Sequence, residues 1–133
     1  MKLLLFIIML ALSSFSSYAK DISLNCEMTK YGNTTNVNVA KSWVNPKSEF
    51  EVNGNNAIYY YSNKSLSGNA QDKGDRLKMY FSRPVSMTIQ GSSKKVKANM
   101  VVDYFYDSKK IVIDWRFVGF KDLGGVWGTC KES

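Results

Sequence analysis

Apolar and polar side chains alternate along most of the chain with a period of two residues. This period places apolar side chains on one face of a β-strand, whereas amphipathic helices repeat every three to four residues. We therefore expect an all-β chain of about eight strands with short links, a mainly antiparallel meander. The expected strands carry these apolar positions: Ile22, Leu24, Cys26 and Met28; Val37, Val39 and Trp43; Phe50 and Val52; residues 57–61; Leu77, Met79 and Phe81; Val85, Met87 and Ile89; residues 96–106; residues 111–117; and residues 126–131.

Turn-forming residues separate these strands. Residues 53–56, Asn-Gly-Asn-Asn, are a strong hairpin signal. Residues 31–33 predict a turn, Asn45-Pro46 and Pro84 predict strand ends, and Asp107-Ser108 predicts a two-residue hairpin loop. Residues 62–75 are almost entirely polar and predict a long loop, a type of segment that is often mobile or functional.

The first 19 residues have the pattern of a secretory signal peptide. Lys2 precedes an apolar run over residues 3–12, and Ser17 and Ala19 provide small residues before a cleavage point. The run is about half of the roughly 20 residues that a membrane-spanning helix needs. We expect residues 1–19 to be a signal peptide and residues 20–133 to be a single exported domain without a transmembrane segment. The lysine- and asparagine-rich body favours a bacterial origin, and hence the periplasm or the extracellular space.

Two cysteines, Cys26 and Cys130, lie near opposite ends of the expected domain. In an exported chain, an even count at such positions favours a structural disulfide. Closing a loop of about 100 residues is worth on the order of 4–5 kcal/mol in the chain-entropy model. The bond would join the first and last strands, which suits a β-barrel or a two-sheet β-sandwich, because either arrangement removes exposed edges. We expect the barrel and keep the sandwich as the alternative.

The chain contains no histidine. This excludes histidine-activated nucleophiles and removes the commonest metal ligand. With both cysteines oxidised, tetrahedral zinc would have almost no ligands, so we expect no metal, no cofactor and no enzyme activity.

Paired carboxylates are the remaining route to catalysis. If Asp107-Ser108 is a two-residue loop, Val101 faces Asp114, and Asp103 lies diagonal to Asp114 at roughly 7–8 Å. Inverting glycosidases use a similar carboxyl separation. Arg116 shares this face, however, so a solvated ion pair explains the arrangement equally well. A small carboxylate hydrolase is therefore the third hypothesis below.

The charge of the chain is strongly positive, at +7. Loss of Lys2 with the signal leaves +6. A basic exported domain attracts polyanions, such as phosphorylated lipid head groups and anionic wall polymers. The tightest cationic group is Lys94, Lys95 and Lys97, whereas Lys109 and Lys110 are expected at the opposite end of the same hairpin. No motif for specific nucleic-acid recognition is visible.

Aromatic residues complete the candidate contact surface. Tyr59, Tyr60 and Tyr61 are consecutive, so at least one must face away from the core of a strand. Trp127 alternates away from Cys130. Exposed Tyr and Trp are effective contact residues, so we expect Tyr60 and Trp127 to contribute to binding, together with the three lysines. Two other tryptophans, Trp43 and Trp115, are expected in the core.

Three functions are compatible with these features. The first is a non-enzymatic periplasmic or secreted binding module, with a protein or an envelope polyanion as its partner. The second is a periplasmic inhibitor or immunity protein that blocks a toxin or hydrolase. Charge complementarity disfavours a basic, lysozyme-type target and suits an acidic one. The third is the small hydrolase, whose activity should be lost when Asp103 and Asp114 are changed to Asn.

Overall fold

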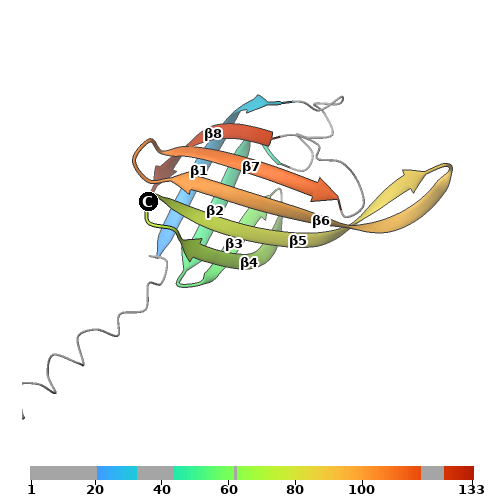
Figure 1. Cartoon of the computed structure of the whole chain (residues 1–133), viewed down its shortest axis with the longest axis horizontal. Coiled ribbons are helices and arrows are strands. Elements are labelled where there is room, and N and C mark those ends of the chain that lie inside the picture. The colour runs from blue at the N-terminus through green and yellow to red at the C-terminus, as the bar shows by residue number, and fades with distance from the viewer. Residues whose placement is uncertain (1–20, 33–43, 62, 118–124) are drawn as a thin grey trace, which may run out of the picture.

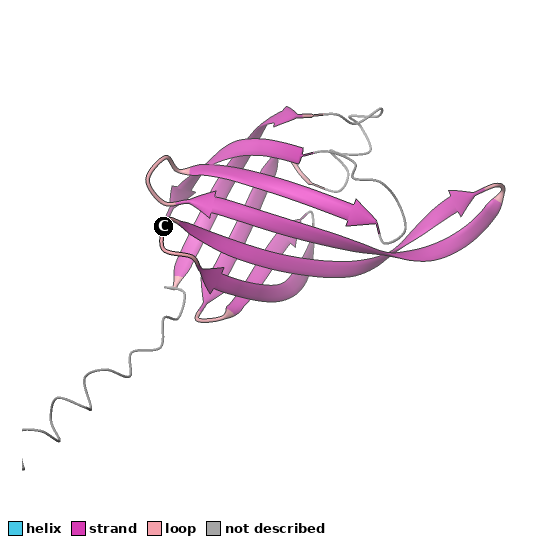
Figure 2. Cartoon of the chain, in the orientation of Figure 1, coloured by secondary structure: helices cyan, strands magenta, loops and turns pink. Residues whose placement is uncertain are grey.

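The computed structural model describes residues 21–32, 44–61, 63–117 and 125–133. These residues form eight strands, each antiparallel to the next along the chain, and the last strand pairs with the first to close a barrel (Figures 1 and 2). The barrel predicted from the sequence is therefore confirmed over the sandwich. The strands are β1 (Ile22–Tyr31), β2 (Lys47–Asn53), β3 (Asn56–Tyr61), β4 (Lys64–Asp72), β5 (Arg76–Ile89), β6 (Ser92–Phe105), β7 (Lys110–Phe117) and β8 (Gly125–Glu132).

The interior of the barrel is a packed apolar core. Alternate residues of each strand point inward, and in a barrel of eight strands the interior is just wide enough for side chains to fill it. Trp115 belongs to this core, as expected. The largest fully buried side chains are Tyr59, Tyr104, Phe50, Leu24, Leu77, Met79, Ile111, Ile113, Val44, Val52, Val102 and Val126.

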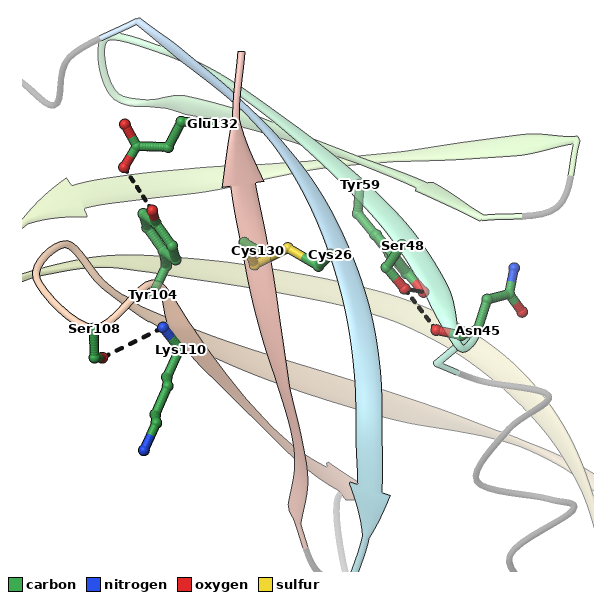
Figure 3. Close-up of a disulfide and its surroundings, with 9 residues drawn as sticks. All are labelled: Cys26, Asn45, Ser48, Tyr59, Tyr104, Ser108, Lys110, Cys130 and Glu132. Carbon is green, nitrogen blue, oxygen red and sulfur yellow. Dashed lines mark hydrogen bonds between the residues drawn. A yellow bond between two sulfur atoms is a disulfide. The ribbon is translucent and has the colours of Figure 1, made fainter.

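The predicted disulfide lies on the seam that closes the barrel. Cys26 on β1 is directly opposite Cys130 on β8, with the two Cα atoms 4.0 Å apart and an S–S bond of 2.04 Å (Figure 3). Both cysteines are buried. The bond therefore adds a covalent link to a seam that backbone pairing already closes. It is compatible with an exported protein.

The long loop predicted over residues 62–75 is wrong, because most of that segment is strand β4. Its inward positions are Leu66, Gly68 and Ala70, and the last two are small where the neighbouring strand is bulky. A Cβ atom on Gly68 would lie 2.6 Å from the Phe81 ring and 2.1 Å from the Tyr80 carbonyl oxygen. The aromatic ring of β5 thus supplies the apolar volume that β4 lacks, and the alternation in β4 is too weak to stand out in the sequence.

The strand end predicted at Pro84 is also wrong, because β5 continues through it to Ile89. Proline has no N–H to donate, so it is tolerated where one side of a strand has no partner. The pairing of β4 with β5 ends at Asn69 opposite Tyr80, before Pro84 is reached. On the other side, Pro84 faces Lys97 of β6, and the two strands stay in register.

Of two predicted hairpin turns, one is confirmed and the other is longer than predicted. Gly54, with φ of +59°, follows Asn53 in the expected β2–β3 hairpin, which is confirmed. The β6–β7 turn covers residues 106–109 instead of two residues, with Lys109 in the left-handed region at φ +60° and its N–H donated to the Phe105 carbonyl at 3.0 Å. The extra residues are added symmetrically, so Val101 still faces Asp114 as predicted.

Some predictions fall outside the described residues. These are the signal peptide over residues 1–19 and the strand with Val37, Val39 and Trp43, which stay predictions. Tyr31, at which a turn was predicted to begin, is instead the last residue of β1, and Asn33 of that predicted turn lies outside the described residues. None of the described residues forms a helix with the length and apolar character of a membrane span.

Candidate functional site

The hairpin of β5 and β6 extends beyond the barrel. Within the described residues, β7 pairs with β6 only as far as Ala98 and β4 leaves β5 at Tyr80, so residues 84–97 pair only with each other. We call residues 84–97 the arm; Figure 1 shows it projecting from one end of the barrel. At its tip, Gln90 and Gly91 have φ of 50° and 79°, as in the tight two-residue turns that match the twist of a β-ribbon.

The three lysines predicted as a contact group lie on the arm. Lys94, Lys95 and Lys97 are all exposed. Period-two geometry places Lys95 and Lys97 on one face of the ribbon and Lys94 on the other. Lys109 and Lys110 lie at the opposite end of β6 and β7, as expected. The arm thus carries a concentrated positive charge away from the rest of the barrel.

Carboxylates are absent from this part of the sequence. Residues 76–102 contain no Asp or Glu, and their cationic side chains are Arg76, Lys78, Arg83, Lys94, Lys95 and Lys97. Arg83 lies at the base of the arm, with its guanidinium carbon 5.0 Å from the centroid of the Tyr61 ring. The three lysines were predicted from the sequence, whereas the absence of carboxylates around them was not, although the sequence carries it as a gap of 27 residues between Asp75 and Asp103.

A shallow groove of about 510 Å³ lies at the base of the arm, on the outer face of β5, β6 and β7. Val101 is at its centre, with Tyr80 opposite it on β5 and Asp114 opposite it on β7. Tyr80 is 37% exposed. The outward-facing residues that line this outer groove are Lys78, Tyr80, Ser82, Asn99, Val101, Asp103, Asp114 and Arg116.

The end of the outer groove nearest the arm is polar. Ser82 donates a hydrogen bond from its hydroxyl to the side-chain oxygen of Asn99, and Asn99 lies opposite Arg116. Because the amide oxygen of Asn99 accepts this bond, its NH₂ group remains a donor. A polar row thus crosses three strands through Ser82, Asn99 and Arg116. Its middle member, Asn99, is two residues from Lys97 on the same face of β6.

The two carboxylates considered for catalysis both line the outer groove. Asp103 Oδ1 lies 3.7 Å from Lys78 Nζ and 3.9 Å from Arg76 Nη1. Asp103 thus has the surroundings of an ion-paired surface residue. Asp114 is exposed on β7. The structure therefore brings the predicted pair to one face, with Asp103 held in a cluster of cations.

The other two candidate contact residues lie on separate faces of the barrel. Tyr60 on β3 donates a hydrogen bond to Glu51 Oε2 at 2.9 Å, and this bond raises the pKa of Tyr60. Trp127 on β8 is 38% exposed and faces away from the disulfide, as predicted. Lys30 Nζ lies 5.5 Å from the centroid of its ring, a cation–π distance. The structure does not bring either residue together with the lysines of the arm.

The barrel interior offers little room at the end from which the arm projects. A void of about 20 Å³ is lined by Tyr59, Tyr61, Leu66, Phe81, Arg83, Ala98, Met100 and Trp115. That volume accommodates about one water molecule. Among the described residues, no three His, Cys, Asp or Glu side chains come together as a metal site. The outer surface is therefore the more suitable place for a ligand of any size.

Tyrosines at the end of the barrel away from the arm are structural. Tyr104 is fully buried and donates from its hydroxyl to Glu132 (Figure 3). Glu132 also accepts from Lys109 Nζ at 2.8 Å. Burial and the bond to Glu132 raise the pKa of Tyr104 well above its ordinary value. Burial and the nearby Asp72 raise the pKa of Tyr106 to about 12. Both phenols thus stay protonated at neutral pH and serve as hydrogen-bond donors.

Comparison of the chain with family models, with curated proteins and with solved structures found no significant match. The function must therefore be argued from the arm and the outer groove themselves.

Proposed function

We propose that this chain is an exported, non-enzymatic binding module whose arm binds a polyanion of the bacterial envelope. The observation that carries the proposal is the arm itself: Lys94, Lys95 and Lys97 project from the barrel on a hairpin that contains no carboxylate. The signal-like residues 1–19 and the Cys26–Cys130 disulfide support an exported location, in the periplasm or outside the cell.

The position of these charges favours a long-range, salt-dependent interaction. Exposed charges act over about one Debye length, roughly 8 Å at physiological ionic strength. On the arm, no carboxylate lies within the hairpin to neutralise the lysines. On the barrel wall, by contrast, Lys78 and Arg76 share Asp103, and Lys109 pairs with Glu132. On the arm, an extended anion therefore meets three exposed lysines with no carboxylate in the same hairpin.

Inorganic polyphosphate is a suitable probe, because it carries dense charge and no other recognition feature. We expect the K94Q/K95Q/K97Q variant to bind polyphosphate at least tenfold more weakly than the parent protein at low salt, and the affinity of the parent to fall steeply as salt rises. Titration calorimetry at several salt concentrations measures both effects.

The control is a variant with the same net charge, K73Q/K110Q/K131Q, in which the three exposed lysines lie toward the end of the barrel away from the arm. We expect it to lose less than twofold in affinity. Equal losses in the two variants would show that only net charge matters, and the arm would then have no special role.

A protein partner is the second candidate, and the projecting shape of the arm favours it. A two-stranded ribbon with a tight turn at Gln90 and Gly91 has the form of an element that enters an acidic cleft, as in an inhibitor or immunity protein that blocks a toxin. Such an interface has a desolvated centre and resists salt. Capture of a partner that stays bound at high salt would favour this function over the polyanion.

A further inference from the structure

The outer groove and the arm share one face of β6. Lys95, Lys97, Asn99 and Val101 alternate with the residues that face the barrel interior, so their side chains lie on the same side of the strand. Successive members of this row are about 7 Å apart along the strand. An extended ligand that contacts Lys97 therefore reaches Asn99 and the floor of the outer groove at Val101.

The chemistry of the outer groove differs from that of the arm. The charged side chains of the arm are all cationic, and the arm has no aromatic residue, whereas the outer groove combines an aromatic ring at Tyr80, donors at Asn99 and Arg116, and the exposed carboxylate of Asp114. A carboxylate repels the phosphates of a simple polyanion but accepts hydrogen bonds from hydroxyl groups. The outer groove is thus suited to a neutral, hydroxyl-rich part of a ligand whose anionic part lies on the arm.

We propose that the ligand is an acidic polysaccharide, with sugar rings in the outer groove and acidic groups against Lys95, Lys97 and Arg116. This inference rests on the proposed function and makes it more specific. The exposed ring of Tyr80 offers an apolar face to the C–H groups of a sugar, and half-buried Val101 continues that face. Asn99 and Asp114 then supply a donor and an acceptor for sugar hydroxyls.

The test compares three probes: polygalacturonate as an acidic polysaccharide, polyphosphate as a polyanion without sugar, and dextran as a neutral polysaccharide. We expect the parent protein to bind polygalacturonate and polyphosphate but not dextran. The Y80A variant should bind polygalacturonate about fivefold more weakly while its affinity for polyphosphate changes less than twofold. The matched control, F105A, removes an outward-facing aromatic ring near the other end of β6, outside the outer groove, and should change neither affinity by as much as twofold.

A second variant guards against a loss that comes from misfolding. V101F fills the floor of the outer groove without removing any polar group, and it should weaken polygalacturonate binding at least as much as Y80A does. Near-ultraviolet circular dichroism checks that each variant keeps the tertiary packing of the parent.

The outcomes separate this inference from the proposed function. If Y80A and V101F leave the ratio of the two affinities unchanged, the outer groove does not bind sugar, and the polyanion function stands. The saccharide is also excluded if anionic vesicles or nucleic acid bind and polygalacturonate does not. If the K94Q/K95Q/K97Q variant binds polyphosphate as well as the parent protein, the polyanion function itself fails.

Discussion

The same two strands, β5 and β6, build both the barrel wall and the arm. In the wall they pair with β4 and β7 and bury one face, whereas in the arm they pair only with each other among the strands that the structure describes. Val102 in the wall is fully buried, but Val96 on the same face of β6 is only half-buried. The difference shows that alternation sets the direction of a side chain, while neighbouring strands decide whether that side chain is buried.

The contrast extends to the edges of the two strands. In the wall, every strand pairs with a neighbour on each side over at least part of its length, so the sheet closes on itself there. In the arm, Pro84 stands on one outer edge and lysines stand on the other, residues that discourage pairing with a further strand. The lysines of the arm thus combine ligand attraction with protection of an exposed edge.

The largest effect on the wall should follow removal of the disulfide. The C26A/C130A variant loses a cross-link between residues 104 apart in sequence, and in the chain-entropy model its free energy of unfolding falls by about 4–5 kcal/mol. Urea denaturation of the oxidised parent and the variant measures this difference. Hydrogen exchange in the arm should stay unchanged, because the arm lies on β5 and β6, far from the seam between β1 and β8. Equal urea midpoints would show that backbone pairing of β1 with β8 closes the barrel by itself.

A smaller effect should follow the addition of one methyl group at Gly68. In G68A the new Cβ meets the Tyr80 carbonyl and the Phe81 ring, and the overpacked wall loses about 3 kcal/mol of unfolding free energy. The control is S67A, at the neighbouring exposed position of β4, which should change stability by less than about 0.5 kcal/mol. A stable G68A protein would mean that β4 can move away from β5 at little cost.

Gly68 also explains why one strand was missed in the sequence. The barrel, its closure and its disulfide followed from alternation and from two cysteines, because these signals lie within single strands or in a simple count. Strand β4 has only Leu66 as a large inward side chain. Its place in the wall depends on Phe81 of the next strand, and such a contact between strands leaves no periodic signal in either strand.

The candidate site could be predicted only in part for a similar reason. The group of Lys94, Lys95 and Lys97 was found because its members are close in sequence. The outer groove was not found, because Tyr80, Asn99 and Arg116 come from three strands and meet only through their register. Pro84 was interpreted as the end of a strand, which hid the arm, because the absence of a neighbouring strand at that point is a property of the fold.

The smallest expected effect is also the most direct test of the difference between the barrel wall and the arm. V102A in the wall and V96A in the arm remove the same two methyl groups from the same face of β6. At Val102, which is fully buried, the lost burial and the resulting cavity should cost about 2 kcal/mol of unfolding free energy. At Val96, which is half-buried on a ribbon without neighbours, the cost should stay below about 0.5 kcal/mol.

Urea denaturation of the two variants at several protein concentrations shows why the loss of stability in V96A would be larger than expected. If V96A costs as much as V102A and the cost fades on dilution, the arm packs against a second copy of the chain. If the cost is independent of concentration, the arm folds back against its own barrel. In either case the lysines of the arm would be less available than the proposed function requires. A small effect at Val96 beside a large one at Val102 would instead support an arm that projects freely from a rigid wall.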